Sequence, residues 1–290
     1  MAFTIKELES LSGIKAHTIR IWEQRYHFLK PVRTSTNIRT YNSEELKTLL
    51  TVALLNKYGY KISRIDEMHK DQRNNALLEL QVPEAKNEYL VNELIGFMVD
   101  LKSTEFEEIL NRKIVEHGLP ATISIIFQFL EKVGLLWQGN KVNPAQEHIV
   151  SNIIRQKIIA SIDKIPLQTK RPPLALLFLP EYEHHELGLL FVYYLLRQQG
   201  IACIYLGANV PLKDLEFIVR VKNPDFLYTH LTSFPRQLQF RKFIQQLGSK
   251  SDATKILVSG GVFSKNIHAL PPNIQVLKSI AELTSYISTL

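Results

Sequence analysis

A short polar segment at residues 181–188 contains side chains that could bind a metal ion. The imidazole of His185 would be a good ligand for a transition metal such as cobalt, and Glu183 could orient the ring by accepting its other N–H. Gly188 would let a bulky ligand approach the backbone closely. Without further context, two histidines in an acidic, exposed loop are more often an ordinary polar loop.

A second group of side chains, near the N-terminus, suits nucleic acid. Residues 1–41 contain seven basic and three acidic side chains, in a chain of net charge +7. The spacing predicts a helix over 15–27 that buries Ile19 and Trp22. Its polar side chains could contact base edges or phosphates: Lys15, His17, Thr18, Arg20 and Arg25. A solvated basic face on a small helical domain is the competing interpretation.

A third group lies in the middle of the chain, where nine residues separate Trp137 from the pair Glu147-His148. Taken alone, Trp137 is an ordinary core aromatic residue at a helix end. Glu147-His148 could equally be the first turn of a helix that begins after Pro144. These residues therefore indicate a function only in combination with the rest of the chain.

The first 70 residues predict a head built of short helices and a hairpin. Helices over 3–10 and 15–27, separated by a turn at Gly13, form a helix-turn-helix. Residues 30–41 are extended around a polar tip and contribute Lys30, Arg33 and Arg39 to a basic wing. Further helices follow at about 43–58 and 62–70, and the polar residues 71–84 are predicted to be a linker.

Helical periodicity without strand signals continues over residues 85–164 and predicts a four-helix bundle. The four helices are expected at Tyr89–Leu101, Glu105–Gly118, Pro120–Trp137 and Ala145–Ile162. Residues 165–173, rich in Pro and Lys, are predicted to be a second linker.

From residue 174 onward, apolar runs alternate with helical segments, which predicts an α/β doubly wound parallel sheet of the flavodoxin-like kind. Strands are expected at 174–179, 202–206, 226–230 and 255–259, and the last helix near 280–289. The segment 181–188 follows the first strand, at the sheet edge where such folds bind ligands. The fold class is thus multidomain, with a winged head at 1–75, a bundle at 85–165 and a sheet domain at 172–290.

The head resembles the MerR family of regulators, through the string HTIRIWEQRYHFLKPVRT and the later IRTYNSEEL, which together span His17 to Leu46. The resemblance implies paired heads on a two-fold symmetric operator in double-stranded DNA. It adds Tyr26 and Tyr41 to the DNA-binding residues. The chain departs from most of that family because residues 71–84 are too broken for a long coiled coil. Cys203 is the only cysteine, so a soft-metal sensor is not expected.

The sheet domain resembles cobalamin-binding domains, whose signature runs Asp/Glu-x-His-x-x-Gly, then Ser-x-Leu, then Gly-Gly. Here Glu183-x-His185-x-x-Gly188 is followed after forty residues by Thr229-His230-Leu231, and after twenty-eight more by Gly260-Gly261. The resemblance implies that His185 is the lower axial ligand of cobalt. It also implies that the displaced base of the cofactor lies between Thr229 and the glycine pair. Thr in place of Ser is a departure that could tighten this slot.

The order of head, bundle and cobalamin domain resembles the light-sensing, cobalamin-dependent repressors of carotenoid genes. In that family the signature Trp-x9-Glu-His, here Trp137, Glu147 and His148, surrounds an upper 5′-deoxyadenosyl group. The resemblance implies adenosylcobalamin, a homo-oligomer (dimer or tetramer), and release from DNA in light. Gln138 replaces a histidine that ligates cobalt after illumination in light-responsive relatives, which puts that product state in doubt.

Two other functions are weighed against a cobalamin-dependent repressor. A cobalamin-independent regulator could keep the sheet domain for oligomerisation or a protein partner. An enzyme, such as a corrinoid methyltransferase module, would need a separate catalytic domain for which the chain has no room. No signal peptide or uninterrupted apolar run of membrane-spanning length is present, so a cytoplasmic protein without a membrane partner is expected.

Overall fold

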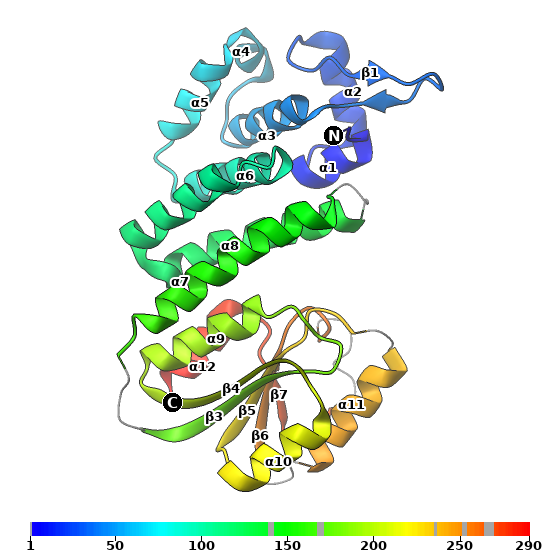
Figure 1. The fold of residues 1–290 in the computed structure, drawn as a ribbon. Helices are drawn as coiled ribbons and strands as arrows, with labels where there is room; N and C mark the ends of the chain where they lie inside the picture. The colour runs from blue at the N-terminus through cyan, green and yellow to red at the C-terminus, as the bar shows by residue number, and fades with distance from the viewer. Residues whose placement is uncertain (1, 139–141, 167–170, 235–236, 251–253, 264–269) are drawn as a thin grey trace. The chain divides into compact units, whose positions relative to one another are not determined.

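The computed structural model describes residues 2–138, 142–166, 171–234, 237–250, 254–263 and 270–290. Its contacts divide the chain into two compact units, Met1–Ile154 and Arg155–Leu290. The first unit is helical with a small hairpin, and the second has a parallel sheet between helices (Figure 1).

The N-terminal part of the first unit is the winged helix-turn-helix that the sequence predicts. Helix α1 (Ile5–Ser12) ends at Gly13, whose φ of 73° is the left-handed conformation that glycine adopts without strain. Helix α2 (Ala16–Arg25) buries Ile19 and Trp22. Strands β1 (Val32–Arg33) and β2 (Arg39–Thr40) pair antiparallel as the wing. Helix α3 (Ser43–Lys57) begins where the Asn42 side chain accepts the Glu45 N–H.

The segment predicted to be a linker is largely helical. After α4 (Ile62–Glu67), helix α5 (Lys70–Leu78) occupies most of residues 71–84. Ala76 and Leu77 are buried, and α5 contacts both α3 and the next helix, α6 (Pro83–Val99). The sequence pattern did not predict α5 because the helix is mostly polar and buries only two side chains. Contacts with neighbouring helices stabilise it.

Three further helical segments complete the predicted four-helix bundle. Helix α7 (Ser103–Gln138) is two helices, since Gly118 interrupts it with φ 76° and ψ 166°, shortly before Pro120. Helix α8 (Pro144–Asp163) follows and crosses the boundary between the two units. By length and composition α7 could cross a membrane. The interruption at Gly118 and the buried side chains of Ile123, Ile126 and Phe129 fit a helix of a protein core.

The second unit contains a five-stranded parallel sheet in the order β4-β3-β5-β6-β7. Its strands are β3 (Arg171–Pro180), β4 (Ile201–Val210), β5 (Phe226–His230), β6 (Lys255–Ser259) and β7 (Ile274–Val276). The doubly wound sheet is thus confirmed. Strand β7 was not predicted, because three residues are too few to show a strand pattern.

Helices cover both faces of this sheet: α9 (Leu187–Gln198) and α12 (Ile280–Ser288) one face, α10 (Leu212–Lys222) and α11 (Gln237–Lys250) the other (Figure 1). The strand order reverses between β3 and β5. The carboxyl ends of these two strands therefore flank the switch point at which doubly wound sheets bind ligands.

Candidate functional site

Glu183 organises the turn that follows β3. Its side chain is buried, with 1% exposed, and one carboxylate oxygen accepts three hydrogen bonds. The donors are the N–H groups of His184 and His185, both at 2.9 Å, and the Nδ1 atom of His185 at 2.6 Å. The turn therefore folds around this carboxylate, as the sequence predicted for its bond to His185.

The other oxygen of Glu183 accepts the N–H groups of Thr232 and Ser233, each at 2.9 Å. These residues follow β5, so one carboxylate joins the turns at both sides of the switch point. Burial by itself would raise the pKa of Glu183. The hydrogen bonds from His185 and Ser233 outweigh it and lower this pKa to about 2.

His185 is oriented as a metal ligand would be. Because Glu183 is ionised, the Nδ1 atom of His185 carries the proton, which places the lone pair of a neutral ring on Nε2. The side chain of His185 is 60% exposed, whereas that of Glu183 is 1% exposed. The turn thus exposes an imidazole ring whose Nδ1 atom is held by a buried carboxylate. Histidine ligands of transition metals are commonly held in this way.

Thr229, at the position of the signature serine, is completely buried. Its Oγ1 atom has no hydrogen-bond partner among the described residues. A buried hydroxyl without a partner is costly and rare in folded proteins. The unsatisfied oxygen fits a site whose missing partner is a polar atom of a bound ligand.

The three glycines of the signature differ in what surrounds them in the structure. A Cβ atom on Gly188 would lie 2.5 Å from the ring of His230, so packing inside the protein already requires glycine here, and its role toward a ligand stays a prediction. Gly260 has φ 106°, and its Cβ atom would lie 2.1 Å from the carbonyl oxygen of Leu231, which is itself buried in the core. A Cβ atom on the exposed Gly261 would meet no described atom closer than 3.8 Å. Among the described residues, Gly261 is therefore the signature glycine that protein packing does not require.

His230 is a site residue that the sequence reasoning did not single out, although it is the middle residue of the Thr-His-Leu motif. Its Nδ1 atom lies 2.7 Å from Ser259 Oγ, which in turn lies 2.5 Å from the Tyr228 hydroxyl. Burial lowers the pKa of His230 to about 4, so its ring is neutral near pH 7. This network connects β5 and β6 beside the switch point.

His230 should make the stability of the protein dependent on pH. The unfolded chain takes up a proton near pH 6.5, whereas the folded chain resists protonation of His230 until about pH 4. We expect the urea midpoint of unfolding to fall as the pH is lowered through this window. The His230→Gln variant should show a shallower fall, and His184→Gln, which removes an exposed histidine, should match the wild type. Equal slopes in all three proteins would contradict this assignment.

The bundle residues of the signature all lie in the first unit. Trp137 is 43% exposed near the end of α7. Glu147 lies in the first turn of α8, where its carboxylate pairs with Nδ1 of His148 at 2.9 Å and accepts the Ser151 hydroxyl. The Gln138 side chain lies outside the described residues. Roles for Trp137, Glu147 and His148 toward a cofactor stay predictions.

The predicted DNA-binding side chains of α2 are mostly exposed: Lys15, His17, Arg20 and Arg25, with Thr18 partly buried. Lys15 lies 3.3 Å from a Glu9 carboxylate oxygen. In the wing, Arg33 is exposed and donates to Asn37 at 2.8 Å. Helix α2 and the wing therefore present basic side chains to solvent.

Three other predicted DNA contacts have positions inside the head. Tyr41 is completely buried, and its hydroxyl donates to Glu23 at 2.8 Å. Arg39 donates to the other Glu23 oxygen at 2.7 Å. Tyr26 is partly buried and stacks on Phe28. The burial of Tyr41 corrects its assignment as a DNA contact, because its side chain cannot reach DNA from the core.

We expect Arg20→Ala to lower affinity for operator DNA about tenfold or more without changing the thermal midpoint, because Arg20 is an exposed side chain of α2. Arg39→Ala should instead lower the midpoint, because it leaves the buried Glu23 carboxylate without its cation. Duplexes selected from a random library provide the operator for a gel-shift titration. Arg220→Ala, an equal loss of charge in the second unit, is the control. An Arg20→Ala protein that binds as tightly as this control would contradict the expectation.

Family models match the head and the helical bundle of this chain. Residues 3–72 match the MerR HTH family regulatory protein model, and residues 90–160 match the B12 binding domain model. Two relatives are from Myxococcus xanthus. The HTH-type transcriptional repressor CarH is 27% identical over 78% of this chain and 77% of its own length. The HTH-type transcriptional repressor CarA is 28% identical over 78% of this chain and 75% of its own length.

Among solved structures, the Methanosarcina barkeri monomethylamine corrinoid protein superposes with a TM-score of 0.56 at 17% identity. It covers 70% of this chain and 100% of its own, and shows that the two share a fold. The chain thus combines a MerR helix-turn-helix head with a B12 binding domain, and it is a homologue of the transcriptional repressors CarH and CarA.

Proposed function

We propose that this protein is a cytoplasmic transcriptional repressor whose assembly and operator binding are controlled by a bound cobalamin. The observation that carries the proposal is the Glu183–His185 pair at the switch point of a chain that begins with a MerR head. A metal-ligand geometry in a DNA-binding protein favours a sensor over an enzyme. In this proposal the three parts are the head at 1–75, a helical cap at 85–165 and the cobalamin domain at 172–290.

His185 Nε2 would hold the cobalt, and Glu183 would keep the proton on Nδ1 so that the ring stays a good donor. The Thr229 hydroxyl and the glycine pair Gly260-Gly261 would lie against the nucleotide tail. When bound, the corrinoid supplies a cobalt–carbon bond that light can cleave. Trp137, Glu147 and His148 are the residues of the cap that we expect to contact an upper adenosyl group.

Control of DNA binding follows from linkage. A ligand that favours one oligomer, a dimer or a tetramer, stabilises it by mass action. Each additional head that reaches the operator then acts at a high effective concentration. Cofactor binding therefore changes operator affinity without any change in the DNA-contacting side chains.

The test is gel filtration of the full chain loaded with adenosylcobalamin, in the dark and after illumination, with absorption recorded across the peak. Coelution of the chromophore with a dimer or tetramer that shifts to a smaller species in light supports the whole proposal. Coelution without a response to light supports a cobalamin-bound repressor that is not a photoreceptor. A colourless protein that still binds operator DNA would instead establish the cobalamin-independent regulator.

A further inference from the structure

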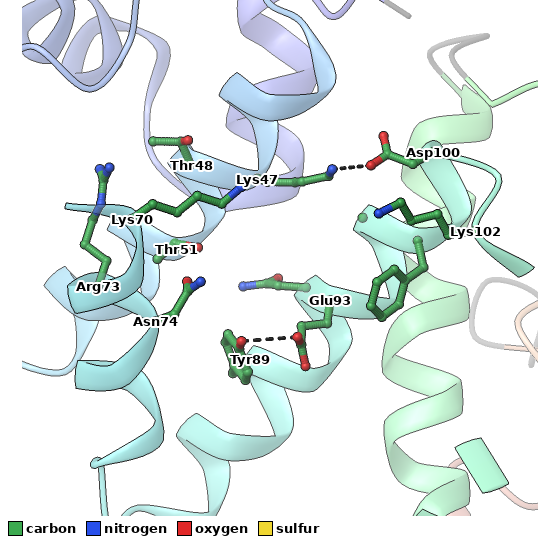
Figure 2. Close-up of a pocket in the computed structure, with 13 residues that line it drawn as sticks. Lys47, Thr48, Thr51, Lys70, Arg73, Asn74, Tyr89, Glu93, Asp100 and Lys102 are labelled. Atoms are coloured by element: carbon green, nitrogen blue, oxygen red, sulfur yellow. Dashed lines mark hydrogen bonds and ion pairs between the residues drawn. The ribbon is translucent and has the colours of Figure 1, made fainter. Parts of the chain in front are cut away.

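A pocket of about 160 Å³ lies within the first unit, between α3 and α5 of the head and α6 of the bundle (Figure 2). The residues that line it include none that we assign to binding DNA or cobalamin. Its lining includes hydroxyl and amide side chains, among them those of Thr48, Thr51, Asn74 and Asn92. Figure 2 shows Thr51 and Asn74 beside the space that Tyr89 and Glu93 border from α6.

Arg73, on α5, lines the pocket and has a hydrogen-bond donor that is not paired with any described residue. Its Nη1 atom is buried and has no hydrogen-bond partner among the described residues. Burial lowers the pKa of Arg73, and the charge of Asp66 offsets only part of this effect. Asp66 itself accepts the His27 N–H at 2.7 Å and pairs with His27 Nδ1 at 3.0 Å. The Asp66 carboxylate therefore already bonds to the backbone and the ring of His27.

Cations outnumber anions around the pocket. Lys47, Lys70 and Lys102 line it together with Arg73, whereas its carboxylates are Asp100 and Glu93. Asp100 pairs with Lys47. Burial raises the pKa of Glu93, which accepts the Tyr89 hydroxyl at 3.2 Å.

The remaining lysines have exposed partners. Lys70 lies 3.1 Å from Glu44, which it shares with Lys47, and Lys102 lies 4.0 Å from Glu105. Such exposed pairs contribute little to stability. Each of these lysines thus has a carboxylate partner, and among the described side chains of the lining it is Nη1 of Arg73 that is left without one.

We propose that this pocket is a second ligand site, which binds a small phosphate monoester that also carries hydroxyl groups. The planar guanidinium of Arg73 suits two phosphate oxygens, and Lys70 adds a point charge from the same helix. Threonine and asparagine side chains would bind the hydroxyl groups of the ligand. Because the walls come from α3, α5 and α6, the bound ligand would hold the head against the bundle. This site is independent of the proposed cobalamin function.

The test is calorimetric titration of the full chain with glycerol 3-phosphate, with inorganic phosphate and glycerol as separate arms. We expect saturable binding of the ester, weaker binding of phosphate and none of glycerol. Arg73→Gln should weaken ester binding at least tenfold, and Lys70→Gln several-fold. The controls Arg64→Gln and Lys86→Gln remove exposed cations of α4 and α6 and should bind within twofold of the wild type.

The head also attracts phosphate, so Arg20→Gln distinguishes the two places and should leave ester binding unchanged. Tighter binding of inorganic phosphate than of the ester would mean a simple anion site and overturn the proposal. So would the absence of saturation up to about 10 mM ester, or equal affinity in Arg73→Gln and Arg64→Gln. If Arg73→Gln does not fold, by circular dichroism, Lys70→Gln against Lys86→Gln decides the question.

Discussion

The His185→Ala variant should lose cobalamin during gel filtration, while His184→Ala retains it. His185 has its Nδ1 atom on the buried Glu183 carboxylate and its side chain exposed, so alanine removes a preoriented ligand. Loss of a group that merely supports a ligand costs about 10- to 100-fold in affinity. We expect loss of the ligand itself to cost at least about 100-fold, measured by absorption titration in the dark.

The neighbouring histidine makes this prediction specific. His184 is exposed, and only its backbone N–H contacts Glu183. Its replacement therefore tests the effect of losing an imidazole from the same turn. In the absence of cofactor His184→Ala should unfold at the wild-type urea midpoint, whereas His185→Ala should still fold but at a somewhat lower midpoint, because its ring bonds to the buried Glu183 carboxylate. If His185→Ala and His184→Ala bind cobalamin equally well, His185 is not the axial ligand.

The second large effect concerns the glycine pair, where Gly260→Ala should destabilise the second unit by about 2–5 kcal/mol. Gly260 has φ 106°, and an added Cβ atom would lie 2.1 Å from the Leu231 carbonyl oxygen and 2.8 Å from its nitrogen. Backbone atoms cannot rotate away as a side chain could, so β6 and the segment after β5 must separate. Urea unfolding followed by circular dichroism measures this loss.

Gly261→Ala is the matched control for stability, because the described atom nearest to the added Cβ atom would be Thr232 O, at 3.8 Å. We expect it to unfold like the wild type but to bind cobalamin more weakly, since the methyl group would occupy the surface that we assign to the nucleotide tail. Equal stability of Gly260→Ala and Gly261→Ala would show that the close approach to Leu231 is relaxed in solution.

Local patterns in the sequence were sufficient for most of the elements. Helical periodicity predicted α2, with Ile19 and Trp22 inside, because one amphipathic helix has a single apolar face to bury. Apolar runs predicted β3 and β5, because a central parallel strand is buried on both faces. Strand β7 and helix α5 were missed, since the first is three residues long and the second is mostly polar.

The sequence by itself determined which residues can do chemistry and in what order: a basic helix, the Trp137 and Glu147-His148 set, and the Glu183-x-His185 turn. Only the tertiary structure decided what each side chain meets. It placed Tyr41 in the core against Glu23, the ring of His230 against Gly188, and the Thr229 hydroxyl in a buried position without a described partner. The physical reason is that spacing along a chain sets the face of an element, whereas burial depends on segments that are distant in the sequence. One carboxylate, Glu183, shows both: its bond to His185 is local, and its bonds to Thr232 and Ser233 arise only when β3 and β5 become neighbours.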